Sequence, residues 1–187
     1  MKARWFITAL ALFMAFNLSA QEEKTKKELR QEKKELKKKE FLAKQALGKA
    51  LLENKDFVLE ANLLTGKKGQ TAQALPKINF IAINGSHIHM QLGSANTLGW
   101  NGVGGITFEG EANTYEVYDD SKSDRVGVRI RYSSMYSRDI ITIDLSINGE
   151  RATARVVSEG RILTMQGSYM SRSESNVFVS QNFVIRN

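Results

Sequence analysis

Asp139–Val157, with the sequence DIITIDLSINGERATARVV, decides the fold of this chain. Large aliphatic residues alternate with polar ones from Ile141 to Ile147, which is the period of a strand with one buried face. Asn148-Gly149 follows directly, and this dipeptide is the strongest short signal for a two-residue hairpin loop. The stretch therefore predicts two antiparallel strands joined by a tight turn.

The two-residue loop also fixes which residues face each other across the hairpin. With Asn148 and Gly149 as the loop, Ile147 is expected opposite Glu150. The other pairs follow in the same register, which gives Leu145 with Ala152, Ile143 with Ala154, Ile141 with Val156 and, on the outward face, Asp144 with Thr153. Because a lone hairpin is only marginally stable, the rest of the chain is expected to supply further strands.

Eight other segments have strand character. They are expected at residues 56–63, 77–83, 86–92, 106–109, 114–119, 125–132, 162–170 and 177–185. Asn84-Gly85 predicts a second hairpin, in which the same rule places Ile81 opposite Ile88. Ten short strands in one domain indicate a mainly β protein, an antiparallel meander that closes into a small barrel or half-barrel, lipocalin-like in outline, with an N-terminal α-helix.

The first twenty residues have the layout of a secretory signal. Lys2 and Arg4 precede an apolar run over residues 5–16, and Ala20 supplies a small residue for cleavage. Three regions are therefore expected, namely a signal peptide over 1–20, a charged N-terminal helix over 21–54 and an antiparallel β domain over 55–187. The alternative is a retained membrane anchor, for which the apolar run is short. An exported chain of this kind is expected to be periplasmic or envelope-associated, with no transmembrane segment after cleavage.

A helix over residues 22–52 is indicated by its many Glu, Lys, Leu and Ala residues, with no proline and Gly48 as its only glycine. Residues 22–40 hold nine basic and six acidic side chains, in a chain of formal net charge +7. An exported protein meets lipid headgroups, polysaccharide and acidic proteins rather than nucleic acid, so an anionic envelope surface or a protein partner is expected for this arm. The candidate contacts are Lys33, Lys34, Lys37, Lys38 and Lys39. A plain solvated helix is the alternative.

The second half of the same helix is expected to lie on the sheet. Apolar residues recur there along one broad stripe, as in a helix with one buried face. The stripe consists of Leu42, Ala43, Ala46, Leu47, Ala50 and Leu51.

With this order of elements, the chain resembles domain of unknown function family 4251, a family of small exported bacterial proteins. The likeness runs over roughly residues 40–170. It is carried by DFVLEA at 56–61, IAING at 81–85, GGITFEG at 104–110 and QGSY at 166–169. The resemblance implies a compact, mostly antiparallel β domain behind a signal peptide, and it brings no catalytic residues with it.

Few residues indicate catalysis or metal binding. His87 and His89 project from one face of a strand, but no third clear ligand accompanies them, and we interpret them as surface or helix-covered side chains. The acidic turn at 119–124 lacks the full calcium-loop pattern, and the glycines at 102–105 lead into a strand rather than a helix. Without cysteine there is no disulfide or lipidated thiol. No catalytic residue, metal ligand or cofactor is therefore assigned.

The leading hypothesis is a non-enzymatic, exported binding module for an apolar or amphipathic small ligand. Trp100 lies in a glycine-rich loop, where an aromatic side chain can cover the mouth of a barrel, or alternatively fill its own core. Tyr115, Tyr132 and Tyr169 occupy inward positions of their strands and complete the candidate ligand-binding set. The alternative function is an interaction protein that uses the lysine-rich helix. A hydrolase stays as a third hypothesis, because folding can gather acidic residues that are distant in sequence.

Overall fold

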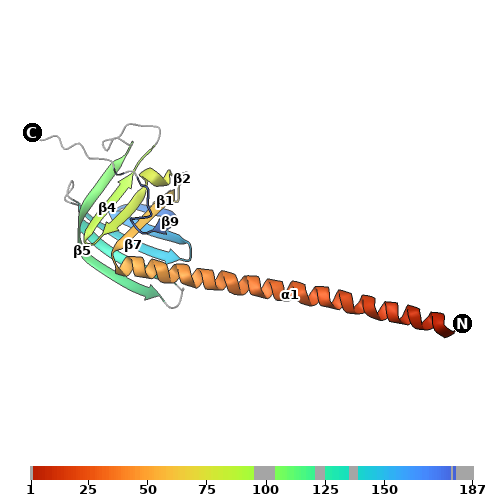
Figure 1. The fold of residues 1–187 in the computed structure, drawn as a ribbon. Coiled ribbons are helices and arrows are strands. Elements are labelled where there is room, and N and C mark those ends of the chain that lie inside the picture. Colours follow the sequence, from red (N-terminus) through yellow and green to blue (C-terminus); the bar gives the residue numbers. More distant parts are fainter. Residues whose placement is uncertain (1, 95–103, 121–124, 135–138, 178, 180–187) are drawn as a thin grey trace, which may run out of the picture. The chain divides into compact units, whose positions relative to one another are not determined.

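The chain forms one long helix and an antiparallel barrel in a computed structural model that describes residues 2–94, 104–120, 125–134, 139–177 and 179 (Figure 1). Side chains are described from Thr25 onward, apart from that of Asp120. The elements are α1 (Lys2–Glu53), β1 (Asp56–Gly66), β2 (Thr71–Gln73), the short 3-10 helix η1 (Pro76–Ile78), β3 (Phe80–Asn84), β4 (His87–Leu92), β5 (Ile106–Asp120), β6 (Arg125–Ser133), β7 (Ile140–Asn148), β8 (Arg151–Ser158) and β9 (Arg161–Met170).

The chain divides into two compact units. The first, Met1–Leu42, is helical throughout its described residues, and the second, Ala43–Asn187, holds the last turns of α1 and the whole sheet. No helix in the described part of the chain is both long and apolar enough to cross a membrane.

The sheet is a meander that closes on itself. Strands β3 to β9 pair with their sequence neighbours, β1 pairs with both β3 and β9, and every pairing is antiparallel. Eight strands therefore form a barrel, and β2 is an extra strand on β1. Gly167 permits the closing contact, because a Cβ there would lie 1.8 Å from the carbonyl oxygen of Glu60 on β1. The predicted class, a mainly β antiparallel meander with an N-terminal helix, is confirmed, and of the two predicted forms, barrel and half-barrel, the structure has the closed barrel.

Three expectations about single strands need correction. The strand expected at 77–83 begins at Phe80, since Lys77 and Ile78 belong to the 3-10 helix η1. Residues 106–109 and 114–119 are not separate strands but one strand, β5, which is bent by an irregularity between Ala112 and Thr114. The extra residue of such a bulge increases the twist, so the strand can turn around the barrel without ending. For the strand expected at 177–185, Val177 and Val179 are not in a strand, and the other residues lie outside the described part of the chain.

Both predicted hairpin registers were wrong by two residues. The structure pairs Ile147 with Ala152 around Gly149-Glu150, and Ile83 with Ile88 around Gly85-Ser86. In each turn only the glycine has a positive φ, 60° at Gly149 and 62° at Gly85. This is the pattern of a turn with glycine at its first central position, so each asparagine stays in its strand. Since a shift of two keeps every side chain on its face, the predicted inward and outward faces remain correct.

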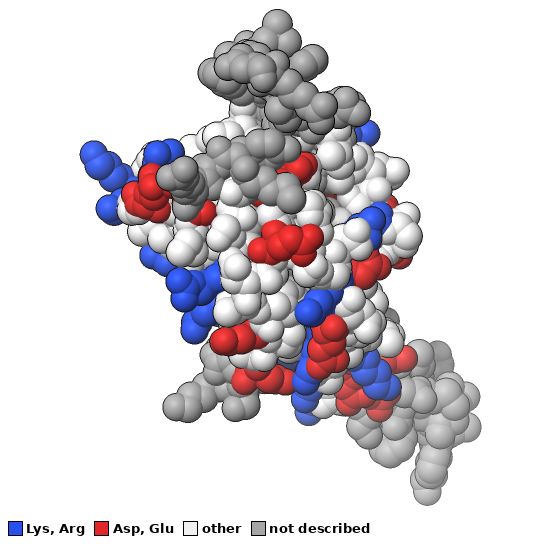
Figure 2. Space-filling model, turned by 90° about the vertical axis from the view of Figure 1, so that its left-hand side faces the viewer, with Lys and Arg blue, Asp and Glu red and all other residues white. Residues whose placement is uncertain are grey.

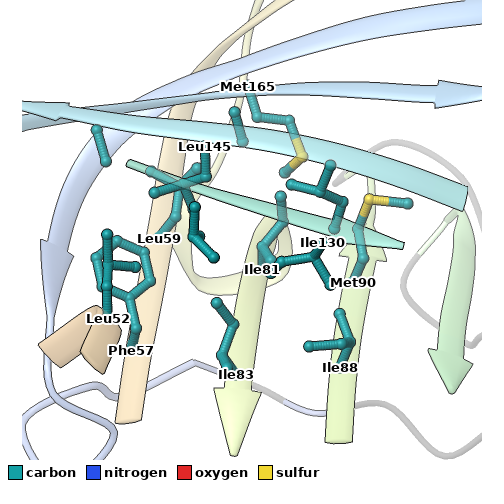
Figure 3. Packing of buried hydrophobic residues seen from close by; sticks show 14 of the residues in the cluster. Leu52, Phe57, Leu59, Ile81, Ile83, Ile88, Met90, Ile130, Leu145 and Met165 are labelled. Carbon is teal, nitrogen blue, oxygen red and sulfur yellow. The ribbon is translucent and has the colours of Figure 1, made fainter. Parts of the chain in front are cut away.

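A hydrophobic core lies inside the barrel, with β5 contributing partly buried residues, and Figure 3 shows ten of the buried residues by name. At one end, where β1 begins and β9 ends, the last turns of α1 cover this core. Leu52 is fully buried there beside Phe57 (Figure 3). We call this the closed end of the barrel.

Of the six residues of the predicted stripe only Leu51 is buried, so the helix covers the closed end with a face that is shifted from the expected one. Gly48, Leu51 and Leu52 are buried, whereas Leu42 and Leu47 are 54% and 55% exposed, and the alanines of the predicted stripe are exposed as well. Gly48 explains the difference, because its missing side chain lets the helix approach Ile147, whose Cδ1 would lie 2.8 Å from an added Cβ. Close approach at a glycine outweighs the larger number of apolar residues on the neighbouring face.

Candidate functional site

The opposite end of the barrel contains an apolar pocket of about 220 Å³. This open end is where β4 ends, β5 begins, and the β8–β9 turn lies. The lining residues are Met90, Leu92, Ile106, Phe108, Asp139, Ile141, Val156, Ser158, Arg161, Ile162 and Leu163. Eight of these eleven are apolar, so the wall offers dispersion contacts and a dry surface rather than a set of catalytic groups.

Strand pairing explains how the wall is assembled. Met90 lies opposite Phe108 and Leu92 opposite Ile106, so β4 and β5 supply one side of the pocket. Val156 faces Leu163 across the β8–β9 pair and supplies the other side. The sequence analysis missed these residues as site candidates. Their inward parity near strand ends was the available signal, but the same parity also fits filled core.

The loop that carries Trp100 connects the two pocket residues Leu92 and Ile106 in sequence. Trp100 itself lies outside the described residues, and its role as a ligand contact stays a prediction.

The polar residues of the pocket gather where β7 begins and β8 and β9 meet. The guanidinium of Arg161 lies 3.9 Å from the carboxylate of Glu159, and its side chain is 81% exposed. A hydrogen bond that the protonated Glu159 carboxyl donates to Asp139, together with the negative charge of Asp139, raises the pKa of Glu159, and Arg161 opposes that shift. The rim therefore combines two carboxyl groups with one cation and can receive the polar end of a ligand.

Tyr115 and Tyr169 belong to the closed end. The Tyr115 hydroxyl donates to the carbonyl of Leu52 over 2.6 Å, and that carbonyl is in the last turn of α1, where helical partners run out. The Tyr169 hydroxyl lies 2.6 Å from the carbonyl oxygen of Lys44 and 2.8 Å from that of Gly149. Both rings lie against the core, and burial raises the pKa of both hydroxyls. These two tyrosines fasten the helix to the barrel.

Tyr132 is fully buried near the end of β6. Its hydroxyl has no hydrogen-bond partner within the described part of the chain, and burial raises its pKa. It pairs across the sheet with Ile141, which lines the pocket, but Tyr132 is not itself a lining residue. The structure thus does not bring the three tyrosines together around one space.

The two histidines lie on the outward face of β4. His89 Nδ1 is 2.7 Å from a carboxylate oxygen of Glu109, and its ring stacks on Phe80 at 5.4 Å between centroids. Burial lowers the pKa of His89, against the opposing effect of Glu109. Across the described residues, no group of three or more His, Cys, Asp or Glu side chains is arranged to hold a metal ion.

The five candidate lysines, Lys33, Lys34, Lys37, Lys38 and Lys39, are all exposed on α1 in the first unit. None of them is among the residues that line the pocket.

Comparisons with known proteins identify relatives but no activity. The sequence pattern described as "Domain of unknown function (DUF4251)" matches residues 39–169. A crystal structure of a DUF4251 family protein from Bacteroides eggerthii DSM 20697 is similar, with 27% sequence identity and a TM-score of 0.59, over 73% of this chain and 93% of that chain. Curated proteins give no match. Since the family pattern covers more than half of its length, the chain belongs to the DUF4251 family of domains of unknown function.

Proposed function

We propose that the protein is a non-enzymatic binding module that holds a small apolar or amphipathic ligand in the open-end pocket. The observation that carries this proposal is the pocket itself, an apolar space of about 220 Å³ in the mouth of a barrel. Mouths of barrels are among the preferred places for small-molecule sites. The volume is below the roughly 300–1,000 Å³ of sites for drug-sized ligands, so the ligand or its buried part is small.

The distribution of polar groups favours an amphipathic ligand. The walls are built from inward residues such as Phe108 and Leu163, whereas Asp139, Ser158 and Arg161 lie where β7 begins and β8 and β9 meet. A ligand bound with its alkyl part inward would keep its polar end near these three side chains. On the basis of the signal-like residues 1–20, we place this role in the periplasm or at the cell envelope.

A series of straight-chain alcohols of increasing length tests the proposal by calorimetry. Each methylene that enters the pocket is worth about 0.8 kcal/mol, which is about a fourfold gain in affinity. The affinity should therefore rise with chain length and then level off once the pocket is full. A purely surface interaction would show no such limit, and an absence of binding along the whole series would contradict the proposal.

A matched pair of variants locates the binding. Ile106 lines the pocket and is 46% exposed, whereas Ile140 is 53% exposed at the same end of the barrel and does not line it. Ile106→Trp should fill part of the pocket and shorten the longest alcohol that binds. Ile140→Trp should leave the series unchanged. Equal effects of the two substitutions would place the binding elsewhere.

A further inference from the structure

The helix α1 carries its charges on separate faces between residues 25 and 40. At 3.6 residues per turn, seven basic side chains fall within an arc of about 140° around the helix. They are Lys26, Lys27, Arg30, Lys33, Lys34, Lys37 and Lys38. Three of the four glutamates of this segment, Glu28, Glu32 and Glu35, lie on the opposite side together with Lys39, and the fourth, Glu40, lies beside the edge of the arc. We call the seven-residue arc the basic face.

Every side chain of the basic face is exposed. None of the seven forms an ion pair with another described residue. The face extends over about 20 Å, since thirteen residues of α-helix rise 1.5 Å each. Seven like charges at this spacing repel one another, so an anionic surface that neutralises them would be favoured.

Four cations of the second unit, Lys44, Lys49, Arg129 and Arg161, do pair with carboxylates. Arg129 lies 3.0 Å from Asp144, Lys49 lies 3.1 Å from Asp119, and Lys44 pairs with Glu150. On the side of the barrel shown in Figure 2, acidic and basic side chains are interspersed. The basic face of α1 differs from these four cations, because none of its seven side chains pairs with a carboxylate of a described residue.

We propose that the basic face is a docking surface for a membrane that contains anionic lipids. Six of its seven cations are lysines, which act as point charges with flexible stems. Recognition of individual carboxylates or phosphates on a protein or nucleic acid favours the planar, bidentate fork of arginine instead. A broad helix face of lysines matches a surface on which anionic headgroups are mobile and evenly spread. Leu29 and Leu36 border the arc, and both are more than half exposed.

Vesicle binding by the full chain tests this inference. The ratio of affinities for equimolar phosphatidylglycerol/phosphatidylcholine vesicles and for pure phosphatidylcholine vesicles isolates the electrostatic part, because apolar insertion contributes to both. This ratio should be well above one at low salt and should fall as salt is raised, since screening acts within about 10 Å at 0.1 M. A ratio near one would overturn the inference.

Two single substitutions supply the matched control. Lys37 is on the basic face and Lys39 is on the opposite face, two residues along the same exposed helix. A lysine near an anionic bilayer contributes about 1 kcal/mol, so Lys37→Gln should lower the ratio about fivefold. Lys39→Gln removes the same charge from a position farther from the bilayer by about a helix diameter, and it should lower the ratio much less. Equal losses would show that net charge, rather than this face, controls binding.

Sedimentation of the wild type and of the Lys37→Gln variant tests whether the basic face binds a second copy of the chain instead of a membrane. If the chain ignores anionic vesicles but forms dimers that Lys37→Gln changes in sedimentation, the face binds a second copy and the membrane proposal is wrong. The alcohol series acts on the pocket and not on α1, so this inference stands or falls independently of the proposed ligand site.

Discussion

The two ends of the barrel differ in what covers their inward apolar side chains. At the closed end the core is covered by Leu52, and the hydroxyls of Tyr115 and Tyr169 bind carbonyls of the covering helix. At the open end no described helix covers the inward residues, and an apolar pocket remains between β4–β5 and β8–β9. The same type of inward side chain is structural where a helix covers it and available to a ligand where none does.

The largest expected effect tests the covering role of the helix. Leu52→Ala removes a fully buried side chain from the closed end, and such truncations typically cost about 2–5 kcal/mol in the free energy of unfolding. Leu47→Ala makes the same change five residues earlier at a 55% exposed position, where substitutions usually stay within about 0.5 kcal/mol. Urea unfolding of both variants measures the difference.

This pair also separates the structure from the sequence-based expectation. The apolar stripe predicted Leu47 as a packed residue, so a large loss in Leu47→Ala together with a small loss in Leu52→Ala would favour the stripe over the structure. The stripe was a reasonable expectation from apolar periodicity. A periodic pattern is read from apolar side chains, and Gly48 has none. The pattern therefore gave no signal that the helix approaches the barrel most closely at Gly48.

The sheet was more predictable than the pocket, for a physical reason. Alternation along Arg125–Ser133 and Ile140–Asn148 fixes which side chains point inward, and a register error of two leaves that assignment intact. The turn was harder to predict than the faces, because Asn148-Gly149 and Gly149-Glu150 are both acceptable two-residue loops. The first loop needs a positive φ at Asn148 and the second does not. The position of the pocket depends on which inward side chains leave space between them, and alternation along a strand does not show this. Met90 and Met165 have similar sequence patterns, yet only Met90 lines the pocket.

A smaller effect distinguishes the hydroxyls at the closed end from that of Tyr132, which pairs with the pocket residue Ile141. Tyr169→Phe removes a hydrogen bond to the helix while keeping the ring that stacks on Phe57, so it should cost about 1 kcal/mol in the free energy of unfolding. Tyr132→Phe removes a buried hydroxyl without a described partner and should be neutral or stabilising. Thermal unfolding of the two variants in parallel gives the comparison. A loss of stability in Tyr132→Phe would indicate that this hydroxyl binds a buried water or ligand.

The smallest expected effect concerns one exposed glutamate at each end. A hydrogen bond from Lys44 and its charge lower the pKa of Glu150 at the closed end, whereas Asp139 raises the pKa of Glu159 at the open end. Glu150 therefore contributes stability above the unfolded-state pKa, and this contribution is lost as the pH falls through its lower folded-state value. For Glu159 the favourable contribution exists at low pH and is lost as the pH rises through its higher folded-state value.

The two isosteric substitutions should consequently have opposite signs at neutral pH. Glu150→Gln should lower the unfolding temperature, because it removes the partner of Lys44, and the deficit should shrink on acidification. Glu159→Gln should raise the unfolding temperature, because it removes the repulsion with Asp139, and that gain should also shrink as the wild-type carboxyl becomes protonated. Unfolding temperatures of both variants and the wild type across the acidic to neutral range provide the measurement. The same sign for both would mean that the rims do not differ electrostatically, and the distinction between a fastened end and a receptive end would then rest on the helix and the pocket alone.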